Sequence, residues 1–187
     1  MIKNWYIFSK KGNFMQFIDL AKSRYSCRAF SEKPVETEKL DLVLEAGRLA
    51  PTATNAQPVR VLVLKSEEAL TKLRGLTRMA YNAPVVLVVL YDTDVSWKAA
   101  NYNDPFDAGD MDASIVATHL MLAAKSVGLD SLWARAFNAA EVAKAFDLPE
   151  NVHVACIVDI GYADPENGGP SPRHSARKPM AEFAKEI

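Results

Sequence analysis

The sequence predicts a single α/β or α+β domain in which helices flank a central sheet of about four strands. Three observations support this fold class. Helical and strand patterns alternate along the 187 residues, and a continuous apolar run at residues 84–90 is typical of a strand covered on both faces. Residues 108–127 form the longest helical pattern. Because this pattern is apolar nearly all round, we expect the helix to be buried on more than one side, partly against a second subunit.

The composition is that of a globular domain, with 49% hydrophobic and 24% charged residues. The 22 basic and 23 acidic residues leave a net charge of -1, so no bulk field favours nucleic acid or an anionic membrane as a partner. Cys27 and Cys156 lie far apart and predict reduced thiols in a cytoplasmic protein. The three histidines are not spaced as ligands, so no metal site is expected.

The N-terminal segment 1–14 carries an apolar run too short for a secretory signal. We expect it to be an extension outside the domain of residues 15–187. Within that domain, Asp112, His119 and Lys125 interrupt the long helix too often for a membrane span. The sequence therefore predicts no membrane partner.

The first half of the chain contains patterns for three helices and one strand. Apolar spacing predicts a short helix at 15–23, and carboxylates after Pro34 indicate a second helix at 36–48. Residues 59–64 form a strand pattern, and a serine followed by two glutamates is typical of the start of a helix at 66–73.

The second half repeats this alternation. Residues 92–107 are polar and without periodicity but keep aromatic side chains, so they form either a substrate-facing flap or a plain surface loop. An irregular strand at 129–136, a helix at 138–149 and a strong strand at 152–161 follow. The remaining residues, rich in proline and glycine, predict an extended surface arm.

Residues 24–30 are the first candidate binding site, because they concentrate hydrogen-bond donors. Arg24, Ser26 and Arg28 occupy alternate positions, so in an extended chain they converge on one phosphorylated ligand. A second interpretation stays open, since basic residues at a helix end also interact with the helix dipole while they lie in solvent. Residues 50–58 and 175–179 add hydroxyl, carboxamide and basic groups.

Common catalytic motifs are missing from the sequence. No G-x-G-x-x-G follows a strand, and G-x-x-x-x-G-K, H-E-x-x-H and G-x-S-x-G do not occur. The three donor-rich stretches suit a large planar phosphorylated ligand instead. We assign no catalytic side chain.

Four sequence motifs occur here in the order found in the nitroreductase family. They are R-x-S-x-R-x-F from Arg24, A-P-T-x-x-N-x-Q-P from Ala50, a long helix that runs into G-L-D-S-x-W, and R-K-P from Arg177. The chain resembles this family over residues 15–187. The resemblance implies an α+β sandwich with a mostly antiparallel sheet of about four to five strands, assembled as a homodimer with FMN at the subunit interface.

The resemblance also implies which residues contact the flavin. Those that match are Arg24, Tyr25, Ser26, Arg28, Pro51, Thr52, Ala53, Asn55, Gln57, Leu132, Trp133, Ala134, Arg177 and Lys178. The stretch 24–30 and the C-terminal R-K-P motif would together hold the phosphate of FMN, through Arg24, Ser26, Arg177 and Lys178. Arg28 would also reach the pyrimidine edge of the ring. Where many members have a lysine two residues before Arg177, this chain has Ser175, which leaves Arg177 and Lys178 to carry the charge.

Two other parts of the implied site have alternative interpretations. By resemblance, residues 50–58 approach the flavin of the other subunit, but such a loop is also an ordinary helix-terminating turn. Residues 132–134 would lie over the flavin ring with a backbone N–H near N5. For Trp133 the alternative is an ordinary core position, the commoner one for a lone tryptophan next to apolar neighbours.

The function implied is that of an FMN-dependent oxidoreductase. NAD(P)H as co-substrate would pass hydride to flavin N5, and a small acceptor such as a nitroaromatic, a quinone or a second flavin would then take the electrons in a ping-pong sequence. The alternative is a flavin-binding module without turnover, for storage or sensing. A weaker alternative is a nucleotide-binding protein without flavin.

Overall fold

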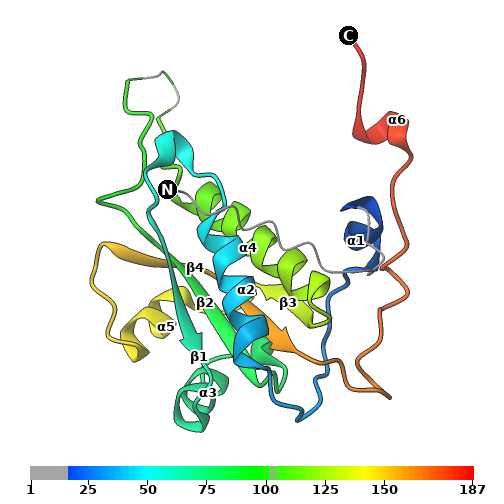
Figure 1. Cartoon of the computed structure of the whole chain (residues 1–187). Coiled ribbons are helices and arrows are strands. Elements are labelled where there is room, and N and C mark those ends of the chain that lie inside the picture. The colour runs from blue at the N-terminus through cyan, green and yellow to red at the C-terminus, as the bar shows by residue number, and fades with distance from the viewer. Residues whose placement is uncertain (1–16, 102, 104) are drawn as a thin grey trace, which may run out of the picture.

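The computed structural model describes residues 17–101, 103 and 105–187, and it contains a four-stranded antiparallel sheet (Figure 1). The strands lie in the order β1-β2-β4-β3. Their bounds are β1 (Val59–Leu64), β2 (Val85–Asp92), β3 (Asp130–Ala134) and β4 (Val152–Gly161). The predicted α+β class and central sheet are confirmed. The predicted extension at residues 1–14 lies outside the described residues.

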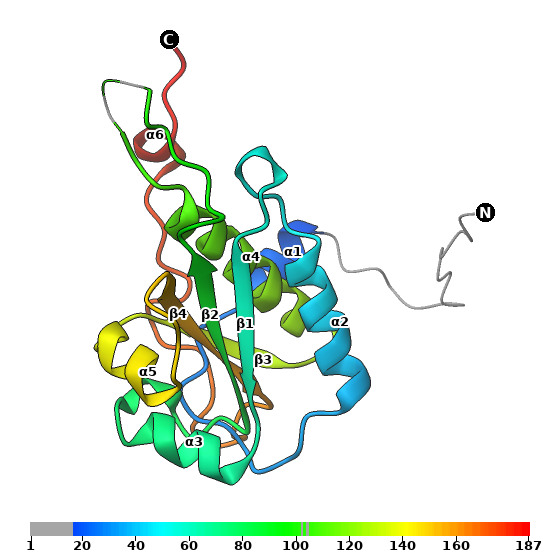
Figure 2. The same ribbon diagram turned by 90° about the vertical axis from the view of Figure 1, so that its left-hand side faces the viewer.

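Two helical layers cover the sheet (Figure 2). One face carries α2 (Thr37–Arg48) and α4 (Gly109–Ser126), and the other carries α3 (Glu67–Arg74) and α5 (Ala139–Ala145). β2 lies between two other strands, and its residues Val85 to Leu90 are all buried. The expectation of a strand covered on both faces is therefore confirmed, because alternate residues of β2 enter separate cores on the two faces.

The long helix α4 packs along the sheet and against α2. Gly47 of α2 makes this approach possible, since a Cβ there would lie 2.6 Å from Cδ2 of Leu120. On its outer side, α4 leaves Met111 and Ile115 exposed. The helix ends as predicted at Gly128, which adopts a left-handed conformation with φ of 79°.

The shorter elements match the sequence patterns with some differences. α1 (Phe17–Ser23) precedes the arginine-rich stretch, and Asn138 Oδ1 accepts hydrogen bonds from the first backbone N–H groups of α5. The helix expected at 138–149 ends at Ala145, because Asp147 turns the chain with φ of 52°. The strand expected at 129–136 is shorter, since it pairs with β4 only over residues 130–134.

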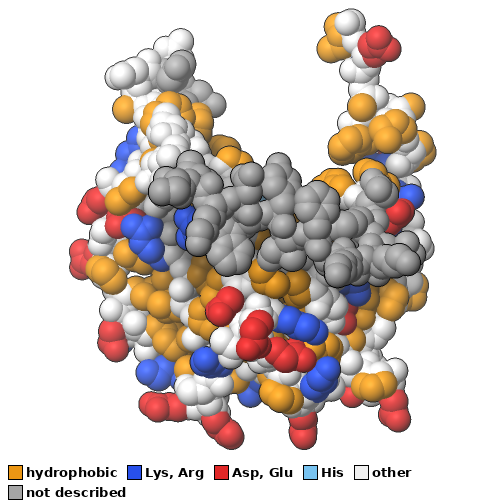
Figure 3. All heavy atoms as spheres, in the orientation of Figure 1, with side chains coloured by type: hydrophobic (Ala, Val, Ile, Leu, Met, Phe, Trp, Pro, Cys, Tyr) orange, Lys and Arg blue, Asp and Glu red, His pale blue; other side chains and the backbone are white. Residues whose placement is uncertain are grey.

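The C-terminal arm extends away from the body of the domain (Figures 1 and 2). The expectation of a wholly extended arm is wrong in one detail, because it contains the short helix α6 (Met180–Phe183). Met180 and Phe183 are strongly exposed there, and Figure 3 shows apolar side chains gathered on this end of the arm. Among the helices of the described residues, none has the length and apolar character needed to cross a bilayer.

Candidate functional site

The stretch that follows α1 runs alongside β3. Ser26 forms a parallel bridge with Ser131, and the backbone N–H of Cys27 donates to the Ser131 carbonyl at 3.0 Å. Cys27 and Phe30 are buried in the core, whereas Arg28 is exposed. Burial is the main reason that the pKa of the Cys27 thiol rises to about 11, so this cysteine is a packed, protonated side chain.

The exposed side of this stretch meets the C-terminal arm at a hollow of about 220 Å³, which we call the arginine hollow. It is lined by Arg24, Tyr25, Ser26, Arg28, Ser171, Arg173, His174 and Arg177. The structure therefore brings together five residues predicted from sequence, four near the N-terminus and one near the C-terminus. Sequence reasoning missed Ser171, Arg173 and His174, which no motif marks.

The arginine hollow concentrates positive charge. Four of its lining residues are arginines and none is acidic. Within the described part of the chain, none of the four guanidinium groups forms an ion pair with a carboxylate. Arg28 Nη1 donates to the Ser26 carbonyl at 3.2 Å, and Arg177 Nη1 donates to the His174 carbonyl at 2.6 Å. Four like charges around one hollow repel one another, so an anion there would be strongly favoured.

Lys178 does not line this hollow. Its Nζ lies 3.4 Å from Oε2 of Glu182, one turn further along, and both side chains are exposed. Arg173 and Arg177 are the two cations that the C-terminal residues bring to the hollow, and a role for Lys178 in flavin binding stays a prediction.

Tyr25 forms a neutral wall of the hollow. Burial, and then the nearby carboxylate of Asp130, raise the pKa of its hydroxyl to about 12. Asp130 in turn pairs with Lys125 at 2.8 Å, and the Lys125 ammonium lies 5.0 Å from the centroid of the Tyr25 ring. These contacts fix the ring at the start of β3.

The three predicted residues of β3 point to different sides of the sheet. Leu132 and Ala134 are buried in the core that contains Phe30. Trp133 points the other way and is 40% exposed, so the core interpretation of this tryptophan is wrong. Its indole is available to a ligand on the α4 side of the strand.

The loop of residues 50–58 lies elsewhere in the chain. Its members Ala50, Thr52, Ala56 and Gln57 line a separate hollow of about 620 Å³ together with residues of α2 and β1. Thr54, Asn55 and Gln57 all have positive φ, between 53° and 59°, which is uncommon for residues other than glycine. Pro51, Asn55 and Gln57 are exposed, and Ala53 is half-buried. Within one chain, this loop does not join the arginine hollow.

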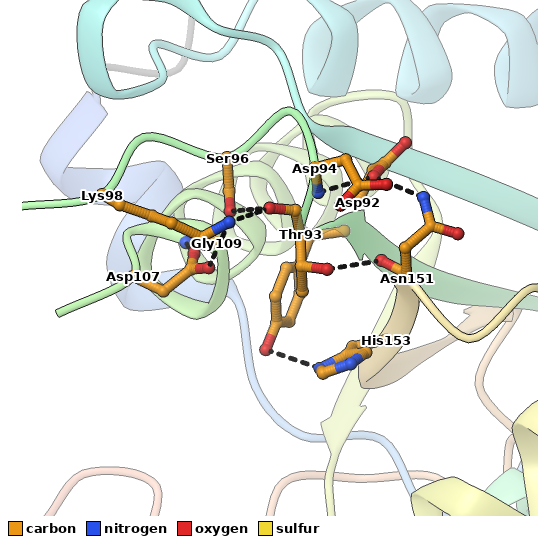
Figure 4. A network of polar contacts seen from close by, with 10 residues as sticks. Asp92, Thr93, Asp94, Ser96, Lys98, Asp107, Gly109, Asn151 and His153 are labelled. Atoms are coloured by element: carbon orange, nitrogen blue, oxygen red, sulfur yellow. Dashed lines mark hydrogen bonds and ion pairs between the residues drawn. The ribbon is translucent and has the colours of Figure 1, made fainter. Parts of the chain in front are cut away.

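Hydrogen bonds hold the first residues of the segment 92–107 to Asn151, just before β4 (Figure 4). Asn151 Nδ2 donates to Asp92 Oδ1 at 2.9 Å, and Thr93 Oγ1 donates to the Asn151 carbonyl at 3.1 Å. Further along this segment, Lys98 and Asp107 form an antiparallel bridge, and their side chains lie 4.0 Å apart as an ion pair. Nearby, His153 Nδ1 lies 3.3 Å from the Tyr91 hydroxyl, a structural contact. The interpretation of residues 92–107 as a substrate-facing flap stays a prediction, as does that of a plain surface loop.

Comparison with known proteins identifies the family. A model of the nitroreductase family matches residues 21–78 and 72–162. A relative from Archaeoglobus fulgidus, named by inference as an NADH dehydrogenase/NAD(P)H nitroreductase, is 31% identical over 151 residues, which cover 77% of this chain and 83% of that protein.

Solved structures agree with this assignment. The structure of a nitroreductase family protein from Clostridium difficile 630 has a TM-score of 0.84 at 37% identity and covers 91% of this chain and 98% of that one. That of an FMN-dependent nitroreductase from Clostridium difficile R20291 has a TM-score of 0.68 at 26% identity, with 86% and 98% covered. The chain therefore belongs to the nitroreductase family.

Proposed function

We propose that the arginine hollow binds the phosphate of FMN and that the chain is an FMN-dependent oxidoreductase. The observation that carries this proposal is the set of four guanidinium groups around one hollow, without a carboxylate in its lining. A phosphate monoester accepts several charge-assisted hydrogen bonds, each contributing about 1.5–3 kcal/mol. The name of the FMN-dependent relative from Clostridium difficile R20291 supports this choice of ligand.

The residues next to the hollow fit the remainder of a flavin. Ser26 offers a hydroxyl beside β3, and Trp133 offers an exposed aromatic surface two residues beyond Ser131. The ligand would thus follow the edge of β3 from charged to apolar surroundings. FMN, when bound, supplies two-electron chemistry by accepting hydride at N5 from one substrate and delivering electrons to another.

A second copy of the chain completes the site in this proposal. The donor groups of Asn55 and Gln57 are exposed on a loop that does not reach the arginine hollow of its own chain. Met111 and Ile115 on α4 leave apolar surface open, as do Phe17 and Ile18 on α1. A homodimer would cover these side chains and bring the loop of one subunit to the flavin of the other.

The reaction we propose is the transfer of hydride from NAD(P)H and then of electrons to a nitroaromatic, a quinone or a flavin, in a ping-pong order. The chain's own part is to bind and orient the reactants, since the thiol of Cys27 and the phenol of Tyr25 keep their protons. Two free, buried thiols are consistent with a cytoplasmic location, which we also propose.

The rival function is flavin binding without turnover. Anaerobic mixing of the FMN-loaded protein with NADH and, separately, with NADPH distinguishes the two. Loss of the flavin absorbance, followed by its return when a quinone or nitroaromatic is added, is the expected result. A flavin that stays oxidised with both nicotinamides would overturn the enzyme and favour a storage or sensing module.

A further inference from the structure

The C-terminal arm supplies half of the arginine hollow, yet it has few ties to the body. Its first part is held where the Asp164 N–H donates to the Ala29 carbonyl at 2.9 Å and Gly168 packs closely against the same carbonyl. Every residue from 169 to 187 is described, and all but one are exposed. The exception is His174, which is half-buried.

His174 contacts the body at the end of α1. Its Nε2 lies 2.9 Å from the carbonyl oxygen of Lys22 in the last turn of that helix. Because a carbonyl only accepts, Nε2 carries the proton, and the bond satisfies one of the carbonyls that a helix end leaves open. The imidazole also meets the Tyr25 ring edge-on, with 6.0 Å between the ring centroids.

The arginines of the arm flank this contact. Arg173 precedes His174 and lines the hollow. It lies in a tight turn that is closed by a hydrogen bond of 2.9 Å from the His174 N–H to the Ser171 carbonyl. Arg177 donates to the backbone carbonyl of His174 itself. The position of His174 therefore determines where Arg173 and Arg177 lie, whereas Arg24 and Arg28 belong to the body of the domain.

We propose that His174 is a positioning residue that fastens the arm to α1 and thereby assembles the phosphate site from two halves. This inference rests on the proposed function of the hollow. Without an anion, the two arginines of the arm are repelled by the two of the body, so the histidine contact opposes that repulsion. Fastening of the arm and binding of the anion must then strengthen each other, because coupling between two equilibria is reciprocal.

Three substitutions separate this role from simple packing. His174→Ala removes donor and ring, His174→Phe keeps an aromatic ring against Tyr25 without a donor, and His174→Gln keeps an N–H donor. We expect the Kd for FMN to rise about tenfold in the first two and to stay within about twofold in His174→Gln, as the loss of one hydrogen bond implies. Ser175→Ala, an exposed neighbour outside the hollow lining, is the matched control and should bind as the parent does.

Limited trypsin digestion reports on the arm independently of FMN. Cleavage after Arg177, a bond that these substitutions leave unchanged, should be faster in His174→Ala and His174→Phe than in the parent, and FMN should protect the parent. Unchanged FMN affinity together with unchanged cleavage in both variants would overturn the role of His174 and leave the proposed function standing. A parent protein that does not bind FMN would overturn the proposed function, and the cleavage rates without ligand would still decide the role of His174.

Discussion

The backbone N–H of Ala53 donates a hydrogen bond to Oδ1 of Asp112 at 2.9 Å, which ties the loop of residues 50–58 to the first turns of α4. Asp112 is only 2% exposed, and its other oxygen has no hydrogen-bond partner among the described residues. Because three residues of the loop hold left-handed conformations, the loop needs such an anchor. The buried side chain of Asp112 therefore anchors the loop that carries the carboxamides of Asn55 and Gln57.

This contact predicts the effect of substituting Asp112. Asp112→Ala should lower the free energy of unfolding by about 2 kcal/mol, since a hydrogen bond is lost and the Ala53 N–H is left without its acceptor. Asp112→Asn keeps an acceptor oxygen and should cost less. Urea denaturation measures both variants. An alanine variant as stable as the parent would contradict the anchoring role.

The two sources of cations in the arginine hollow predict a contrast between three substitutions. Arg24→Ala and Arg173→Ala should each weaken FMN binding about ten- to a hundredfold through one lost charge-assisted contact, without loss of the fold. Lys178→Ala should change the Kd less than about twofold, because Lys178 pairs with Glu182 outside the hollow. Fluorescence titration with FMN measures all three, and circular dichroism checks the fold. A larger effect at Lys178 than at Arg173 would refute this assignment.

The difference between Lys178 and Arg173 shows where sequence reasoning succeeds and where it ends. The continuous apolar run of β2 indicates a strand buried on both faces, and the donors from Arg24 to Arg28 repeat every two residues, which places them on one side of an extended chain. Arg173 and His174 lie in a proline- and glycine-rich arm without a period. Their place depends on contacts of His174 with Lys22 and Tyr25, about 150 residues earlier, that no local pattern encodes.

A buried carboxylate on β4 predicts an unusual dependence of stability on pH. Asp159 is 0% exposed and neither of its oxygens has a hydrogen-bond partner among the described residues, so burial raises its pKa to about 8, and the charge of Arg74 offsets this only in part. The unfolded chain releases this proton near pH 4. Between about pH 4 and 8 the native state holds more protons at this site, and its contribution to stability falls as the pH rises.

Asp159→Asn removes this titration. The variant should gain stability over the parent at pH 8, and this gain should exceed the one at pH 5 by roughly 3–4 kcal/mol. Thermal unfolding at the two pH values measures it. A stability difference between variant and parent that is equal at the two pH values, or larger at pH 5, would show that the carboxyl of Asp159 does not titrate as described.

The exposed apolar side chains of α1 and α4 predict association. Light scattering at micromolar concentration should give the mass of a dimer, twice 20.6 kDa. Replacing both Met111 and Ile115 with Asp should shift the protein towards monomer, because charged groups would then have to be buried at the interface. A monomeric parent that still binds FMN tightly would contradict the shared site.

The central claim is that the arginine hollow recognises a phosphate. Fluorescence titration of the cofactor-free protein with FMN and with riboflavin, which differ only in that group, tests it most directly. We predict that FMN binds at least about a hundredfold more tightly than riboflavin, and that raising the salt concentration reduces this difference in affinity. Equal affinity for the two flavins would contradict the account.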